Sequence, residues 1–413
     1  MKPDIYLFNP TCELAVANGS TNFMASAQLR RFENELGTLP GILARTGDIV
    51  LVDHVPPQQF IDQLEAAGFA LPNYRTTESS LSDEQFVSEQ KGFLFPWGWS
   101  PATHKQISPL KSGCCTKFLR SPIAEWREIH RELYSRKSAL TILENIIAAQ
   151  SSNEFLSLND LPQICKSHDQ ITALQQKWSK VVVKAPWSSS GRGLQILRPQ
   201  EYNQTNKQVI AGFLKQQEYV VAGPWHEKVM DLSFQFYSSG DGVIEYLGMT
   251  SFSTDHMGRY IGNNIQELPA QLAPELHVFL KENLTKTEQY LTKALTASSY
   301  STDYYGWIGV DVLIWKSSDG KFKIHPCLEI NCRFTMGAIA LALRNHLADQ
   351  STGEFRMMHS REGEFASFCE AMKISEPLII NNGKIIRGFL PLTPLSPGST
   401  FGAYVRIINN KNH

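Results

Sequence analysis

A carboxylate, an amide and a guanidinium occupy alternate positions of one short segment. Glu329, Asn331 and Arg333 lie at the end of an alternating apolar and polar run, 321–331, that predicts a β-strand. Because successive residues of a strand point to opposite faces, these three side chains should project from one face. Carboxylate and amide oxygens suit a hard cation such as Mg²⁺, and a guanidinium suits the anion that such a cation carries. A charged sheet face in solvent is the alternative.

Asp311 lies on the preceding strand of a predicted hairpin, and the hairpin register decides whether it joins this group. A two-residue loop at 319–320 places Asp311 on the wrong face. A three-residue loop at 318–320 places it opposite Cys327 and diagonal to Glu329, on the same face. A free carboxylate is unfavourable in the apolar surroundings of these residues. We therefore favour the second register and a metal site made by Asp311, Glu329 and Asn331.

A loop of small residues joins two apolar runs, 181–183 and 194–197, that predict strands. Its six residues are Ser188, Ser189, Ser190, Gly191, Arg192 and Gly193. Backbone N–H groups, hydroxyls and the guanidinium could surround a phosphate here, with Lys184 at the end of the first strand. The pattern is neither a Walker loop nor a dinucleotide fingerprint, and a flexible hairpin tip is the alternative.

Two adjacent bases, Arg136 and Lys137, interrupt the apolar stripe of a predicted helical segment, 122–147. Helical spacing turns one of them toward the buried face, where an unpaired cation is costly. We therefore expect one of these bases to meet an anion. The alternative is that Ser135 caps a new helix and that both bases remain in solvent.

The elements around these groups predict a mixed α/β fold. Strands at 5–8 and 48–52 alternate with helices at 25–36 and 57–67, which is the rhythm of a parallel sheet covered by helices. Further predicted elements are strands at 218–221, 231–237, 308–315, 379–390 and 401–408 and a helix at 336–343. On the strand 231–237, Asp231, Ser233 and Gln235 share one polar face.

Composition narrows the classes of function. The 413 residues are 42% hydrophobic and 19% charged with a formal net charge of −1, which is ordinary for a globular chain of two or three packed units. We expect no nucleic-acid partner, because no run of Lys and Arg occurs. We expect no membrane partner, because no apolar stretch approaches the ~20 residues of a membrane span. The seven cysteines are scattered and no apolar signal segment is seen, so the expected location is cytoplasmic.

The order of these features resembles that of the ATP-grasp superfamily. It runs from Lys137 to Lys184 with its glycine-rich loop, then to Asp231, Asp311 and the run Glu329-Ile330-Asn331-Cys332-Arg333. Each motif alone is weak, but their order over 135–333 is specific. The resemblance implies an N-terminal Rossmann-like domain (1–121), a first ATP-grasp subdomain with the glycine-rich loop (122–217) and a second with the metal site and closing strands (218–413).

The resemblance also implies a role for each candidate residue. Lys137 and Lys184 would contact phosphates, and the loop of Ser188, Ser189, Ser190, Gly191, Arg192 and Gly193 would close over them. The backbone of Val220, Val221 and Ala222 would bind adenine, and Asp231 would face the ribose. Asp311, Glu329 and Asn331 would hold Mg²⁺ or Mn²⁺, and Arg333 would contact the transferred phosphate. Because Trp307 stands where some ligases place an arginine, transition-state stabilisation would fall to Arg333 or Arg259.

The implied activity is that of an ATP- and Mg²⁺-dependent ligase, which activates a carboxylate as an acyl phosphate for attack by an amine. This chemistry needs positioning and charge neutralisation rather than a protein nucleophile. The substrates would be small molecules or short peptides, and the sequence identifies neither them nor the oligomeric state. The alternatives are an ATP-binding protein without ligase activity and an ATP-grasp phosphotransferase that stops at a phosphorylated product.

Overall fold

The computed structural model describes residues 2–188, 193–199, 202–255, 260–266, 268–269 and 271–409. Its N-terminal part contains a parallel sheet with the strand order β3-β2-β1-β4. The strands are β1 (Ile5–Leu7), β2 (Ile49–Val52), β3 (Asn73–Thr76) and β4 (Leu94–Pro96). Strands β1 and β2 are buried over their whole length, as short apolar runs in a sheet covered on both faces should be. The predicted parallel sheet is confirmed.

Short helices surround this sheet. They are α1 (Cys12–Asn18), α2 (Ala27–Glu35), α3 (Gln58–Ala66), α4 (Thr77–Ser82), α5 (Glu84–Ser88), α6 (Pro101–Gln106) and α7 (Thr116–Leu119), with 3₁₀ turns at Leu39–Ile42, Ser108–Gly113 and Pro122–Ala124. The helices α2 and α3 coincide with the two predicted helices to within two residues at each end.

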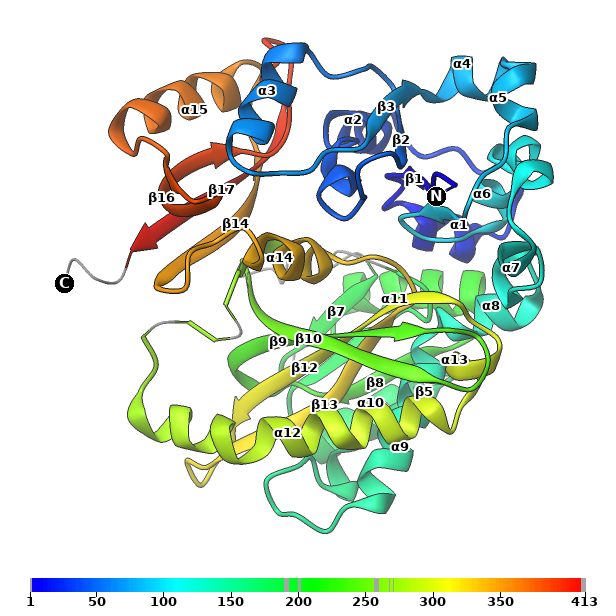
Figure 1. Cartoon of the computed structure of the whole chain (residues 1–413). Coiled ribbons are helices and arrows are strands. Elements are labelled where there is room, and N and C mark those ends of the chain that lie inside the picture. The colour runs from blue at the N-terminus through cyan, green and yellow to red at the C-terminus, as the bar shows by residue number, and fades with distance from the viewer. Residues whose placement is uncertain are drawn as a thin grey trace.

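A larger sheet of nine strands has the order β13-β12-β9-β10-β11-β14-β17-β16-β15. Its strands are β9 (Glu227–Ser238), β10 (Ile244–Thr254), β11 (Tyr260–Asn264), β12 (Gly306–Lys316), β13 (Phe322–Asn331), β14 (Ser351–His359), β15 (Ile379–Asn381), β16 (Lys384–Pro391) and β17 (Phe401–Asn409). Figure 1 shows α14 (Met336–Arg344) between the N-terminal part and the centre of this sheet. The apolar face of α14 therefore joins the N-terminal part and the last strands in one core.

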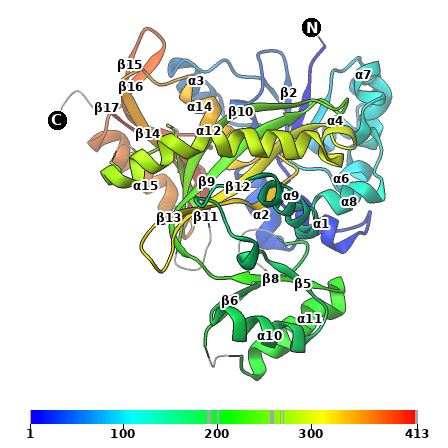
Figure 2. The ribbon, with the colours of Figure 1, turned by 90° about the horizontal axis from the view of Figure 1, so that it is seen from below.

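A small antiparallel sheet with the order β5-β8-β6-β7 forms a separate unit that projects from the rest of the molecule (Figure 2). Its elements are β5 (Gln163–Cys165), β6 (Val181–Lys184), β7 (Leu194–Leu197), β8 (Val220–Pro224), α10 (His168–Trp178) and α11 (Gln204–Gln217). Val181, Val183, Val220 and Ala222 face the two helices and form a core of their own. Because strand residues alternate, Lys184 belongs to the opposite face of this sheet.

The remaining helices cover the large sheet or its ends. They are α8 (Glu128–Leu133), α9 (Arg136–Ala149), α12 (Pro274–Thr296), α13 (Ser299–Thr302) and α15 (Glu364–Ser375), with a 3₁₀ turn at Leu158–Asp160. The apolar stripe of α9 shares a core with the large sheet, whereas β8 pairs inside the small sheet. The small sheet unit therefore spans 163–224, which differs from the predicted segment 122–217. The sequence shows the stripe on α9 but not which sheet will cover it.

The hairpin of β12 and β13 has the predicted turn but a different register. The Ser317 N–H donates to the Lys321 carbonyl at 2.9 Å, and Gly320 has a φ of 82°, as expected for the three-residue loop. An irregularity between Asp311 and Leu313 then shifts the pairing, so that Asp311 lies directly opposite Glu329 rather than opposite Cys327. Pro326 lies in the shifted stretch, and it has no N–H to donate to a regular ladder. The two carboxylates remain on one face, as predicted.

Two further observations bear on the sequence expectations. The seven cysteines are free thiols. In the described parts of the chain, no helix has both the length and the apolar character that crossing a membrane requires.

Candidate active site

A row of polar side chains crosses the three strands at the β13 edge of the large sheet. Ser233 on β9, Asp311 on β12 and Glu329 on β13 are direct cross-strand neighbours. The Ser233 hydroxyl donates to Asp311 Oδ1 at 3.1 Å, and Asn331 Nδ2 donates to Asp311 Oδ2 at 3.4 Å. The structure thus brings together Asp311, Glu329 and Asn331. The sequence singled out Ser233 only by its alternation with Asp231 on the same strand.

The two facing carboxylates create an excess of negative charge on this row. Burial raises the pKa of Asp311 to about 7, and the charge of Glu329 adds to the effect. A divalent cation would relieve this repulsion, and two carboxylates beside an amide are the hard donors that Mg²⁺ prefers. Within the described ranges, no three His, Cys, Asp or Glu side chains gather as a metal site. A cation held by Asp311 and Glu329 would therefore take its other ligands from phosphate and water.

Arg136 is the buried base that faces this row. It begins α9, where Ser135 is the N-cap and accepts from the Ser138 N–H, and its side chain is only 10% exposed. Arg136 Nη2 lies 2.6 Å from Glu329 Oε1, while Nη1 donates to the Ser188 hydroxyl at 2.6 Å. Both sequence alternatives therefore hold in part: Ser135 caps a new helix, and one base meets an anion.

Lys184 approaches the same row from the small sheet. Burial lowers its pKa to about 8, and nearby Arg136 acts in the same direction, whereas Glu329 and Asp311 oppose the shift. An ammonium close to two carboxylates on an inner face is placed to neutralise a bound polyphosphate. The structure therefore places Lys184 beside the acidic row, and its predicted contact with phosphates stays a prediction.

The glycine-rich loop is described only at its two ends. Gly193 has a φ of +70°, and an added Cβ would lie 2.8 Å from Ser188 Cβ, so the close approach of the loop ends requires glycine. The Ala185 N–H donates to the Gly193 carbonyl at 2.8 Å, and Ser188 is bound by Arg136. Ser189, Ser190, Gly191 and Arg192 lie outside the described residues, so their predicted contact with phosphates stays a prediction.

Arg333 links the acidic row to the N-terminal part. Its Nη2 donates to Asn331 Oδ1 at 2.8 Å, and its Nε donates to Glu13 Oε1 at 2.9 Å. Glu13 belongs to α1, which follows the first strand of the parallel sheet. No pattern in the sequence connected Glu13 with Arg333. Arg259, the second predicted catalytic residue, lies outside the described residues.

The strand β8 does not offer the backbone contacts that were expected of it. Val220, Val221 and Ala222 pair with β5 on one side, and Val221 and Ala222 also pair with β6 on the other. Their N–H and carbonyl groups are therefore largely used within the sheet and are not free to bind adenine. The chain leaves the sheet only after Pro224, and the predicted contact with adenine stays a prediction. A strand in the middle of a sheet could not be told from an edge strand by sequence.

Asp231 lies one row beyond Asp311, opposite Leu313 on β12. Burial raises its pKa, and a salt bridge from Lys228 Nζ to Asp231 Oδ2 at 2.7 Å opposes the rise. The predicted contact of Asp231 with a ribose is compatible with this place on the same sheet face, and it stays a prediction.

Three aromatic side chains lie beyond the row, further along β12 and β13. His226, which follows β8, stacks on Trp315 with ring centroids 3.9 Å apart, and His325 lies 6.2 Å from His226. Burial lowers the pKa of His226 to about 4, so this ring is uncharged at pH 7. A neutral aromatic surface next to a cationic and acidic row suits a ligand with a flat base at one end and charged groups at the other.

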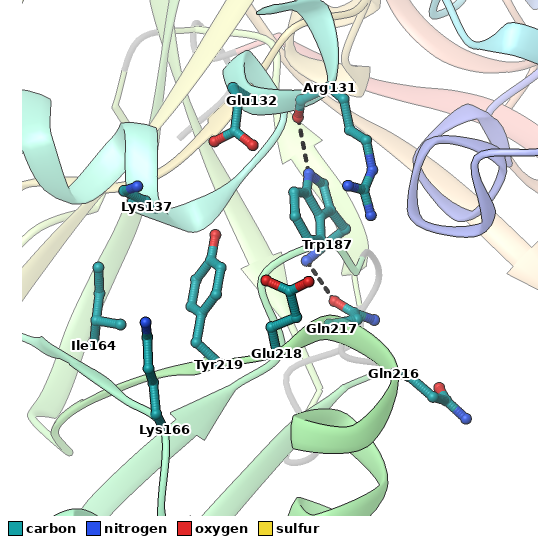
Figure 3. Close-up of a pocket in the computed structure, with 10 residues that line it drawn as sticks. All are labelled: Arg131, Glu132, Lys137, Ile164, Lys166, Trp187, Gln216, Gln217, Glu218 and Tyr219. Atoms are coloured by element: carbon teal, nitrogen blue, oxygen red, sulfur yellow. Dashed lines mark hydrogen bonds between the residues drawn. The ribbon is translucent and has the colours of Figure 1, made fainter. Parts of the chain in front are cut away.

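Lys137 does not reach the acidic row. It is exposed on the other side of α9, where it lines a cavity of about 330 Å³ with Ile164, Lys166 and Tyr219 (Figure 3). Consecutive residues of a helix point about 100° apart, so a helix that turns Arg136 inward turns Lys137 away. In this structure Arg136, rather than Lys137, lies beside the acidic row, and the expected phosphate contact of Lys137 stays a prediction.

Comparison with known proteins identifies the fold. The structure is similar to that of an N5-carboxyaminoimidazole ribonucleotide synthetase in complex with ADP, with a TM-score of 0.52, 11% identity and coverage of 99% of this chain and 94% of that one. The chain has the ATP-grasp fold. A second similar structure is the biotin carboxylase domain of Hydrogenobacter thermophilus 2-oxoglutarate carboxylase with MgADP, ADP and bicarbonate, at a TM-score of 0.50, 12% identity and coverage of 99% and 86%.

Sequence comparison adds one curated relative. The [butirosin acyl-carrier protein]–L-glutamate ligase of Niallia circulans is 24% identical over 305 residues, which make up 73% of this chain. The match spans 64% of the length of that relative. No protein-family model matches the chain. The predicted ATP-grasp resemblance is confirmed at the level of the fold.

Proposed function

We propose that this protein is an ATP- and Mg²⁺-dependent ligase, which activates a carboxylate as an acyl phosphate and joins it to an amine. The observation that carries the proposal is the row of Asp311 and Glu329 with Arg136 and Lys184 beside it, inside an ATP-grasp fold. Paired carboxylates and converging cations on facing sheets are the groups that a nucleotide triphosphate and its metal require.

The geometry suggests how ATP would lie between the two sheets. Its phosphates would lie beside Arg136 and Lys184, and its base would reach the aromatic end formed by His226, Trp315 and His325. Mg²⁺, when bound by Asp311 and Glu329, would neutralise charge on the reacting phosphates. The predicted roles of Asp231, Asn331 and the loop 188–193 belong to this proposal.

The reaction would proceed in two displacements. A substrate carboxylate oxygen attacks the γ-phosphorus, and ADP leaves. The amine nitrogen then attacks the acyl carbon, phosphate leaves and the nitrogen loses a proton to solvent. Arg136 and Lys184 would hold the charge on the phosphates, and Arg333 would orient the acyl phosphate from the side of Glu13. No covalent enzyme intermediate is needed.

The curated relative suggests the kind of substrate. Its name states that it joins L-glutamate to an acyl-carrier protein. We therefore propose that the carboxylate belongs to an amino acid, and that the acceptor group is presented by a small molecule, a short peptide or a carrier protein. Glutamate is the first amino acid to test.

A thermal-shift measurement tests nucleotide binding first. ATP with Mg²⁺ at 100 times its dissociation constant should add about 2.7 kcal/mol to the free energy of unfolding. No shift at millimolar ATP contradicts the proposal.

Trapping with hydroxylamine then tests the chemistry. A hydroxamate formed with ATP and glutamate, or with a pool of amino acids, would show the acyl phosphate. Binding of ATP without ADP release in any pool would favour the ATP-binding protein without ligase activity. A stable phosphorylated product without transfer to an amine would favour the phosphotransferase.

A further inference from the structure

The cavity beside Lys137 lies at the joint between the small sheet unit and the rest of the chain. One wall comes from α8 and the start of α9, and the other comes from β5, the end of α11 and the start of β8 (Figure 3). Its volume of about 330 Å³ is within the range of small-ligand sites. The acidic row lies on the other side of the α9 N-terminus, since Arg136 and Lys137 point in different directions.

Four of the five charged side chains of the cavity are separated by sign. Figure 3 shows Lys137 and Lys166 on the side of Ile164, and Glu132 and Glu218 toward the α8 and α11 sides of the Tyr219 ring. The fifth, Arg131, lies over the Trp187 ring. Among the residues that the structure describes, none of these four charged groups forms an ion pair with a protein group. Elsewhere in the structure, by contrast, many acidic and basic groups pair directly, as Arg136 does with Glu329.

A fixed aromatic wall limits the cavity on its inner side. The Trp187 indole N–H donates to the Arg131 carbonyl at 2.8 Å, and the Trp187 backbone N–H donates to Gln217 Oε1 at 2.9 Å. The Arg131 guanidinium lies 4.0 Å from the centre of the Trp187 ring. These contacts hold the wall in place without a ligand, and a preformed wall reduces the entropy cost of binding.

We propose that this cavity binds an α-amino acid in its zwitterionic form. The ligand's carboxylate would lie toward Lys137 and Lys166, and its ammonium would lie toward Glu132 and Glu218, with the Tyr219 hydroxyl between them. A simple anion would meet the two glutamates and a simple cation the two lysines, so only a ligand with both charges satisfies both sides. Because the walls come from two units, the bound amino acid would bridge the small unit and the α8–α9 segment.

The site is separate from the proposed ATP site, and it can be tested without nucleotide. Thermal shift of the full chain with pools of amino acids selects a binder, and calorimetry then measures its dissociation constant. The N-acetyl and the amide derivatives of the same amino acid remove one charge each. We expect each derivative to bind at least about tenfold more weakly, which corresponds to ~1.4 kcal/mol.

Matched variants locate the binding. Lys166→Met and Glu132→Gln should each weaken binding by about tenfold, because each removes one charged contact. Lys215→Met on α11 and Glu144→Gln on the outer side of α9 should leave it unchanged, since both residues are exposed away from the cavity. All four variants should keep the thermal unfolding temperature of the unmodified chain in the absence of ligand.

Three results would overturn the proposal. They are the absence of binding by any amino acid at millimolar concentration, equal binding of the derivatives with one charge, and binding that survives both Lys166→Met and Glu132→Gln. The last result would place the amino acid elsewhere, for example beside the acidic row. Because no nucleotide is present, none of these results bears on ATP binding, and loss of ATP binding would not affect the cavity.

Discussion

Two neighbouring bases, Arg136 and Lys137, point to different sides of the α9 N-terminus, and their surroundings differ. On one side Arg136 is 10% exposed and lies 2.6 Å from Glu329. On the other side Lys137 is exposed at a cavity, with no anionic partner among the described residues. The same N-cap at Ser135 sets both directions, because it fixes where the helix begins. The acidic row is therefore organised by the chain itself, whereas the cavity charges lack such partners among the described residues, as the proposed amino-acid site requires.

The largest effect is expected from Glu329→Gln in the acidic row. The change keeps the shape of the side chain but removes one charge that would hold Mg²⁺ near the phosphates. Turnover should fall by about 10²–10³-fold, the range found when a stabilising group is removed from a transition state. Release of ADP with glutamate or the amino-acid pool measures the effect.

Glu144→Gln is the matched control, because this glutamate lies on the exposed face of α9. ATP binding should persist in Glu329→Gln, and high Mg²⁺ or Mn²⁺ should restore part of the activity. Activity equal to that of the control would remove Glu329 from the proposed metal site.

Arg136→Met should lower stability, in addition to the loss of activity expected for a residue proposed to hold the phosphates. The substitution leaves Glu329, which is 26% exposed, without its close cation and next to Asp311. Breaking a fully buried pair costs about 3–5 kcal/mol, and partial exposure should reduce the loss to about 2 kcal/mol. Urea unfolding measures the change, and a loss below about 0.5 kcal/mol would mean that the pair is not organised as described.

Gly193→Ala tests the end of the glycine-rich loop that meets Ser188. A side chain here adopts a φ of +70° and brings its Cβ within 2.8 Å of Ser188 Cβ. We expect a loss of about 1–2 kcal/mol in the free energy of unfolding. Gly212→Ala in α11 is the control, because an added Cβ there contacts nothing within 4 Å. That variant should be stabilised by about 1 kcal/mol, and equal behaviour of the two would contradict the loop geometry.

The smallest effect is expected from Lys137→Met. An exposed side chain without a partner contributes little, so the free energy of unfolding should change by less than about 0.5 kcal/mol. Urea unfolding under the conditions used for Arg136→Met gives the direct contrast between the two neighbours. A loss of free energy of unfolding as large as that of Arg136→Met would show that Lys137 has a structural partner. It would contradict the contrast drawn between the two neighbouring bases.

Much of the fold could be predicted from the sequence because the local patterns were strong. The alternation in 321–331 and 231–237 predicted β13 and the centre of β9, and the Gly320 turn predicted a three-residue hairpin loop. The register was missed because the effect of Pro326 on the hairpin ladder depends on which residues of β12 lie opposite it. The sequence of one strand does not show that pairing. The same limit applies to β8, whose central place in the small sheet depends on two distant strands.

The sequence by itself determined which residue types share a face. Strand alternation is a local property, so it placed Glu329 and Asn331 on one face, and the three-residue hairpin loop added Asp311 to that face. Local rules offered a helix cap at Ser135 and a buried neighbouring base as alternatives, and the structure contains both. Only the tertiary structure decided that Arg136 is that base, that Glu13 meets Arg333 and that Lys137 faces a cavity. These outcomes depend on how separate units pack together, and no spacing within a single segment encodes the direction of that packing.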